Sequence, residues 1–89
     1  MKAVITVIGR DSVGIIAKVA NLCAEHSANI EDITQSVLKE YFAMIMLVNI
    51  KDIKCDFAVF VDALAKLGEE NNLEIRAMHE DIFNAMHTI

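Results

Sequence analysis

Two segments of this sequence are apolar on both faces when they are read as β-strands. Residues 2–9 carry apolar or β-branched side chains at almost every position after Lys2. Residues 41–50 place one apolar row on each face of a strand: Phe42, Met44, Met46, Val48 and Ile50 on one, and Tyr41, Ala43, Ile45 and Leu47 on the other. A strand with one solvent-exposed face alternates apolar and polar residues instead. We therefore expect two central strands of a sheet, each covered on both sides.

Amphipathic helices follow both of these segments. Gly9 ends the first strand, Asp11 or Ser12 is expected to cap the first helix, and that helix runs to about His26. Its expected inward side chains are Ile15, Ile16, Val19, Leu22 and Cys23. A second helix starts at about Asp56 and closes at Asn71-Asn72. Its apolar side chains at helical spacing are Phe57, Phe60, Val61, Leu64 and Leu67.

Two further strands complete the pattern, at residues 30–38 and 73–80, and Lys39-Glu40 suits a tight hairpin between the second and third strands. The order is strand, helix, strand, strand, helix, strand. Right-handed crossovers fold this order into an α+β, ferredoxin-like βαββαβ sandwich, a four-stranded antiparallel sheet with two helices on one face. Residues 1–89 are expected to be a single domain, with its core at about 4–80 and a short C-terminal helical tail at 82–89.

Such a fold leaves the other face of the sheet uncovered. Apolar residues make up 55% of the chain, against roughly 45–50% in ordinary domains. Leaving Val4, Ile8 and one row of residues 41–50 exposed forgoes roughly 1.5–3 kcal/mol for each large side chain. A second copy of the chain is the simplest cover, so we expect a homodimer or a higher homo-oligomer.

Charge and cysteine usage exclude several classes of function. The formal net charge is −5, and the lysines and arginines are scattered, whereas direct nucleic-acid binding needs concentrated positive charge. No segment reaches the ~18 apolar residues needed to span a membrane, and no signal-peptide pattern is evident, so we expect a cytoplasmic protein. Cys23 and Cys55 form no C-x-x-C pair, and we expect both to be reduced, with no metal and no cofactor.

The loop after the first strand carries a family resemblance. The run Gly9-Arg10-Asp11-Ser12-Val13-Gly14-Ile15, followed by a helix and then Ala28-Asn29-Ile30, resembles the ACT domain, the small regulatory module of amino-acid metabolism. The segments Asn29-Ile30-Glu31-Asp32-Ile33 and Glu40-Tyr41-Phe42 resemble the UPF0237 family, in which an ACT domain stands alone. The likeness covers nearly the whole chain. It implies dimers or higher assemblies and an amino acid bound at their interface.

The resemblance also implies which residues bind the ligand. Asp11, Ser12, Val13, Gly14 and Ile15 would form the loop side, and Asn29 and Ile30 the strand side. Physical chemistry agrees, because Gly14 allows a close backbone approach and free amides at a helix N-terminus receive a carboxylate. Asp11 or Asn29 would meet the ammonium group. The expected function is a non-catalytic, regulatory binding domain for a small molecule, an amino acid in the first instance, which acts as a homodimer on an unidentified partner protein.

Other interpretations of the same residues stay open. Gly9 and Gly14 also suit a loop that only turns the chain, with Asp11 or Ser12 only capping the helix. The chain would then be a protein–protein interaction module with no ligand. An enzyme is not expected, because the sequence offers no cluster of titratable groups for catalysis. Arg10 gives the loop a superficial likeness to a phosphate loop, but Asp11 would repel phosphate.

Overall fold

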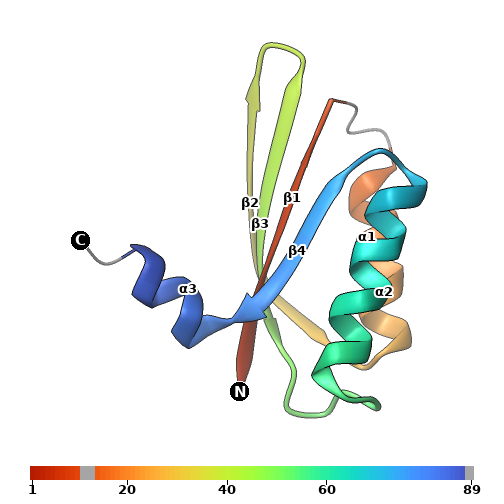
Figure 1. Cartoon of the computed structure of the whole chain (residues 1–89), viewed down its shortest axis with the longest axis vertical. Coiled ribbons are helices and arrows are strands. Elements are labelled where there is room, and N and C mark those ends of the chain that lie inside the picture. Colours follow the sequence, from red (N-terminus) through yellow and green to blue (C-terminus); the bar gives the residue numbers. More distant parts are fainter. Residues whose placement is uncertain (11–13, 88–89) are drawn as a thin grey trace.

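The computed structural model describes residues 1–10 and 14–87. In Figure 1 the sheet is seen nearly edge-on, with two helices on one side and a third on the other. The elements are β1 (Lys2–Gly9), α1 (Ile15–Glu25), β2 (Asn29–Leu38), β3 (Tyr41–Asn49), α2 (Phe57–Glu70), β4 (Glu74–His79) and α3 (Glu80–His87). The elements occur in the predicted order, with boundaries that differ by a few residues.

The sheet has the strand order β2-β3-β1-β4, and every neighbouring pair is antiparallel. β1 and β3 are the two central strands, as their apolar faces predicted. β2 and β4 are the edges. Together with α1 and α2 on one face (Figure 1), this arrangement confirms the ferredoxin-like fold.

The core lies between the sheet and the helix pair α1/α2, and we call the side of the sheet that it covers the inner face. Alternate residues of β1 and β3 meet the apolar stripes of α1 and α2 there. The fully buried side chains include Ile5, Val7, Val19, Cys23, Met44, Met46, Val48, Phe60 and Leu64. Among the described residues no polar or charged residue is buried. Apolar burial is therefore what holds this layer together.

The first helix differs from its prediction at its N-terminal end. The residue at the N-cap position is Gly14, not Asp11 or Ser12, and Asp11, Ser12 and Val13 lie outside the described residues. Ile16, predicted to point inward, is 36% exposed. Ile15, Val19 and Cys23 recur every four residues along the buried stripe, whereas Ile16 lies about 100° around the helix from Ile15.

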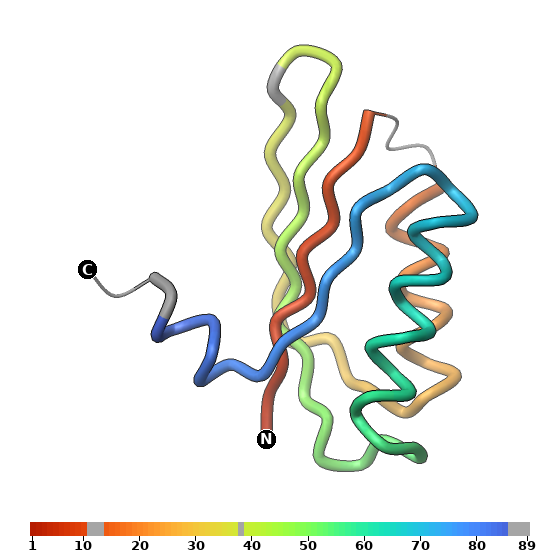
Figure 2. The backbone as a smooth tube through the Cα atoms, in the orientation of Figure 1, coloured from red at the N-terminus to blue at the C-terminus, as the bar shows by residue number. Residues whose placement is uncertain are grey.

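The other side of the sheet, its outer face, is partly covered by α3, which begins at Glu80 directly after β4 (Figures 1 and 2). This helix contacts β1 and β4 of its own chain. Val4, on the outer face of β1, is only 4% exposed, but Ile8 on the same strand is 51% exposed and Ile45 on β3 is 43% exposed. The C-terminal helix thus covers one end of the outer face and leaves the other end open.

Three local features fix how α2 and the turns meet the strands. Lys39 in the β2–β3 hairpin and Asn72 after α2 both have left-handed backbones, with φ of 57° each, as the turn and helix-end predictions require. A Cβ on Gly68 would lie 2.6 Å from the carbonyl oxygen of Leu73, so only glycine allows α2 to come this close to the start of β4.

No helix within the described ranges is long and apolar enough to span a bilayer.

Candidate functional site

Of the residues predicted to form the loop half of the site, the structure describes Gly14 and Ile15. Gly14 adopts a left-handed backbone with φ 74°, and a Cβ built on it would meet no atom within 4 Å. Ile15 is buried in the core, so its side chain anchors the helix and is not available to a ligand. Open space therefore lies directly beside the first turn of α1.

The first amides of α1 are donors that the helix itself does not use. Among the described residues, the first hydrogen bond of this helix is donated by the Lys18 N–H to the Gly14 carbonyl, at 3.1 Å. The N–H groups of the residues between them have no partner earlier in the helix. The first turn contains no acidic side chain to compete for them. The helix dipole adds to the attraction, so this end of α1 suits a carboxylate.

The strand half lies at the start of β2. Asn29 is exposed and pairs with Asn49 of β3, while Ile30 pairs with Val48 and packs against the core. A β-bulge follows, because Asp32 rather than Glu31 pairs with Leu47. Asn29 is thus the one predicted strand residue whose side chain is available to a ligand.

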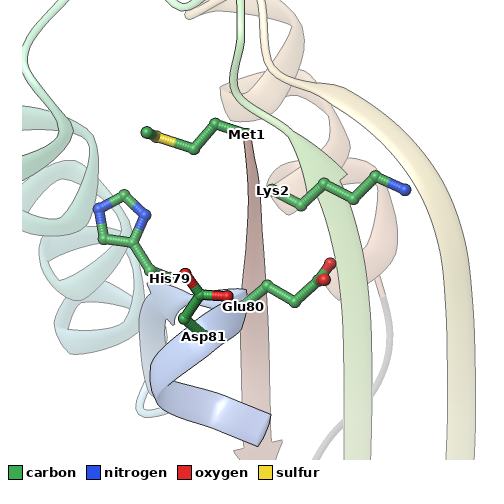
Figure 3. Close-up of a pocket in the computed structure, with 5 residues that line it drawn as sticks. All are labelled: Met1, Lys2, His79, Glu80 and Asp81. Atoms are coloured by element: carbon green, nitrogen blue, oxygen red, sulfur yellow. The ribbon is translucent and has the colours of Figure 1, made fainter.

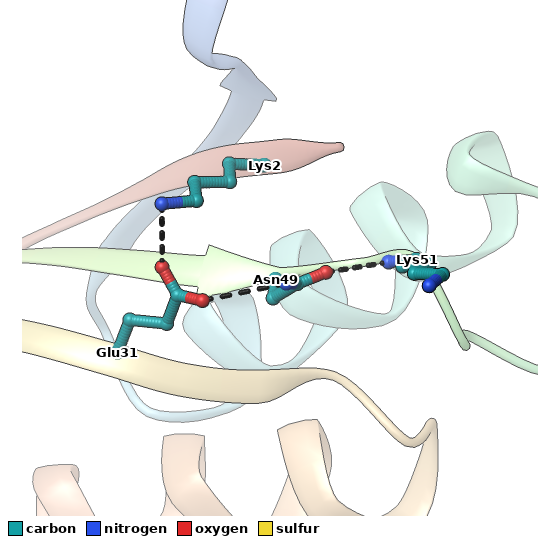
Figure 4. Close-up of polar contacts among 4 residues, drawn as sticks. All are labelled: Lys2, Glu31, Asn49 and Lys51. Atoms are coloured by element: carbon teal, nitrogen blue, oxygen red, sulfur yellow. Dashed lines mark hydrogen bonds and ion pairs between the residues drawn. The ribbon is translucent and has the colours of Figure 1, made fainter.

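A polar network holds this bulge (Figure 4). Lys2 Nζ lies 2.9 Å from Glu31 Oε1, and Asn49 Nδ2 donates a hydrogen bond of 3.3 Å to Glu31 Oε2. The Lys51 N–H in turn donates to Asn49 Oδ1 at 2.9 Å. The hydrogen bond from Lys2 is the main reason that the pKa of Glu31 lies below its ordinary value. Sequence reasoning missed this network, because the pairing depends on strand register and no local motif signals it.

Within one chain, the loop half and the strand half of the predicted site lie at opposite ends of the sheet. Gly9 pairs with Phe42 at one end of the sheet, whereas Asn29 pairs with Asn49 at the end where β1 begins. Helix α1 runs between the two ends, as Figures 1 and 2 show. At 1.5 Å per residue, its 11 residues separate Gly14 from the strand half by roughly 16 Å. One chain therefore does not bring the predicted residues together.

Three pockets formed by the described residues lie elsewhere, and none of them is lined by Gly14, Ile15, Asn29 or Ile30. The first, of about 420 Å³, lies where β1 and α3 begin (Figure 3). Its lining residues are Met1, Lys2, His79, Glu80 and Asp81. In that view the Lys2 amino group points away from the His79 ring. The second, of about 290 Å³, lies between α3 and the outer face and includes Val4, Ile45, Leu47 and Phe83 in its lining. The smallest, of about 260 Å³, lies between α2 and β4.

Cys23 and His26 are held in place by packing and hydrogen bonding within the fold. Burial raises the pKa of Cys23 to about 11, which makes a reactive thiolate unfavourable. His26 ends α1, donates from Nδ1 to the Leu22 carbonyl at 2.8 Å, and packs on Phe60 with ring centres 5.6 Å apart. Across residues 1–10 and 14–87, no three His, Cys, Asp or Glu side chains gather closely enough to hold a metal ion.

Comparison with known proteins assigns the family. A model of the ACT domain matches residues 2–78. The chain belongs to the ACT domain family. The UPF0237 protein of Methanopyrus kandleri is 44% identical to it over 88 residues, which is 99% of this chain and 98% of that protein. The resemblance seen in the sequence is thus confirmed for both the domain and the UPF0237 group.

Solved structures place the same fold in two settings. An ACT domain protein from Streptococcus pneumoniae superposes with a TM-score of 0.82 at 39% identity, covering 100% of this ACT domain and 97% of that chain. A formyltetrahydrofolate deformylase from Pseudomonas syringae superposes with a TM-score of 0.77 at 25% identity, and the match covers 88% of this chain but only 27% of the deformylase. The fold thus occurs both alone and as a minor part of an enzyme. The family is one of regulatory domains that bind small molecules and often form oligomers.

Proposed function

We propose that this ACT domain binds an amino acid between two copies of the chain and, as a homodimer, regulates a separate partner protein. In this proposal residues 1–89 form a single cytoplasmic, non-catalytic domain. The observation that carries the proposal is the separation of its two halves. Gly14 and the first amides of α1 lie at one end of the sheet, and Asn29 lies at the other.

A second copy resolves this separation. A two-fold axis perpendicular to the sheet turns the second chain end for end, so the loop end of one chain lies beside the strand end of the other. The side of the molecule formed by β2 favours such an arrangement, because β2 is an edge strand and α1 contacts it. Each dimer would then contain two equivalent ligand-binding sites, or seats, each formed by amides from one chain and Asn29 from the other.

The chemistry of the two halves favours an amino acid. The first amides of α1 would receive the carboxylate, and Asn29 would accept a hydrogen bond from the ammonium group through its side-chain oxygen. Asp11, which lies outside the described residues, remains a second predicted partner for the ammonium. The open space beside Gly14 would take the backbone part of the ligand.

The first test is a thermal-shift screen against the twenty amino acids at millimolar concentration. A ligand at about 100 times its Kd adds about 2.7 kcal/mol to the folded state, which shifts Tm by several degrees in a domain of this size. Gly14→Asn should abolish the shift, because asparagine tolerates the left-handed backbone but fills the space beside the amides. Lys39→Asn is the matched control, since Lys39 is also left-handed and lies in the β2–β3 hairpin, outside α1 and outside the start of β2.

A mixing experiment tests whether two chains share the seat. Gly14→Asn and Asn29→Ala should each abolish binding alone. In a mixed dimer one of the two seats combines the intact Gly14 of one chain with the intact Asn29 of the other, so binding should return at up to half the sites. Asn21→Ala, an exposed amide on α1, serves as a control that should bind normally. Failure of the mixture to bind, with mixed dimers present, would rule out the shared seat.

A protein–protein interaction module without a ligand is the second candidate. The observation that favours it is the open end of the outer face, where Ile8, Tyr41 and Ile45 are exposed. If none of the twenty amino acids shifts Tm, this candidate replaces the first. Substituting Ile45 with Asp should then abolish partner capture without lowering Tm by more than about 2 °C.

A further inference from the structure

Glu31 connects three of the four strands at the end of the sheet where Asn29 lies. It belongs to β2, and its carboxylate takes a lysine from β1 and an amide from β3 (Figure 4). Both of its oxygens are engaged, Oε1 by Lys2 and Oε2 by Asn49. These contacts tie the residue to its neighbours in the sheet.

One of these neighbours, Asn49, links Glu31 to Asn29. Asn49 is the residue opposite Asn29 in the ladder, and its side chain is fixed from both ends, by Glu31 on one side and by the Lys51 N–H on the other. Glu31 itself is the extra residue of the β-bulge that separates Asn29 and Ile30 from the regular part of β2. Bulges of this kind re-aim the side chains beside them.

We propose that Glu31 is a positioning residue that fixes the start of β2 and, through it, the orientation of Asn29 in the ligand seat, an inference that rests on the proposed function. Without the bridge to Lys2 and Asn49, the bulge loses the side-chain contacts that tie it to β1 and β3. Asn29 would then sample several orientations, and ligand binding would bear the entropy of ordering it.

Glu31→Gln tests the proposal, with Glu74→Gln as the matched control. Glu74 also forms an ion pair, with Arg76 at 3.0 Å, but it lies on β4 at the opposite edge of the sheet. Hydrogen exchange measured without ligand should be faster for the amides of residues 29–33 in Glu31→Gln and unchanged there in Glu74→Gln. Affinity for the amino acid found in the screen should fall about three- to fivefold in Glu31→Gln alone.

Reversal of the pair separates positioning from general stability. The double variant Lys2→Glu with Glu31→Lys keeps an ion pair between β1 and β2, so it should recover slow exchange at residues 29–33 and part of the lost affinity. If Glu31→Gln exchanges and binds like the wild type, the proposal is overturned. It is also overturned if Glu31→Gln and Glu74→Gln lower affinity and Tm equally, because the effect is then not specific to the strand start.

The proposed function can fail separately. If the wild-type protein binds no amino acid, the seat itself is wrong, and the exchange rates alone then decide the role of Glu31. Faster exchange confined to residues 29–33 in Glu31→Gln would support its control of the strand start, and unchanged exchange would overturn it.

Discussion

The two faces of the central strands look alike in the sequence and differ in the structure. On the inner face, Ile5 and its neighbour across the ladder, Met46, are both completely buried under α1 and α2. On the outer face, Thr6 pairs with Ile45, and Ile45 is 43% exposed. Hydrophobic patterning thus predicts that a surface will be covered, but not whether the same chain supplies the cover.

The outer face is itself divided. At the end near the start of β1, Val4 and Leu47 pair across the ladder and α3 lies over them. At the other end, Ile8 pairs with Ala43 and is half exposed. The open end is therefore the part of the outer face where large apolar side chains of β1 and β3 stay exposed.

The largest effect should come from the inner face. Ile5→Ala removes a fully buried side chain and should cost about 2–5 kcal/mol, out of a total of about 5–15 kcal/mol for an ordinary domain. Ile45→Ala, the same change on the neighbouring strand and the opposite face, should cost about 1 kcal/mol or less. Urea denaturation followed by circular dichroism measures both. Equal costs would mean that the outer face is as well covered in solution as the inner one.

The next largest effect concerns the approach of α2 to the sheet. Replacing a helical glycine with alanine ordinarily stabilises a helix by about 1 kcal/mol. Gly68→Ala should instead destabilise the protein by about 1–3 kcal/mol, because the new Cβ would lie 2.6 Å from the Leu73 carbonyl oxygen. Ala65→Gly, at an exposed position of the same helix, controls for helix propensity. A stabilising Gly68→Ala would show that α2 moves away from β4 at little cost.

Removal of α3 should have a smaller effect. A chain ending at His79 exposes Val4 and Leu47 on the outer face, and should lose about 1–2 kcal/mol of folding free energy. The same samples in sedimentation velocity should keep the oligomeric state of the full chain, since the helix contacts its own sheet. Dissociation of the oligomer at unchanged folding stability would show that α3 packs mainly on the neighbouring copy.

The smallest effect should be the pH dependence of the Lys2–Glu31 pair on the outer face. The pKa of Glu31 is lowered from 4.5, so the pair contributes fully above that value and its contribution is lost as the pH falls through the lowered pKa. The pKa of Lys2 is raised from 10.5, so the contribution is lost again at pH values above 10.5. The stabilities of wild type and Glu31→Gln should therefore differ at neutral pH and converge in acid and in strong alkali. A constant difference across this range would show that charge is not involved.

Much of the loop half could be anticipated from the sequence, and less of the strand half. Gly14 has the left-handed backbone that a turn between strand and helix favours, and the family motif points to it directly. The position of Asn29 at a strand start was equally visible. Glu31 was not, because its partners Lys2 and Asn49 are distant in sequence and meet only when the register of three strands is set.

By itself the sequence determined the order of the elements, the two central strands, the inner core and the family. These follow from periodicity, β-branched runs and turn residues, which act within a few positions along the chain. Only the tertiary structure decided that α3 covers Val4 and leaves Ile8 exposed, and that α2 approaches β4 closely at Gly68. It also decided that Glu31 bridges three strands, and that Gly14 and Asn29 lie roughly 16 Å or more apart. Each of these depends on packing between elements, because the direction of a tail, the closeness of a helix and the register of a ladder are set by the free energy of the whole fold.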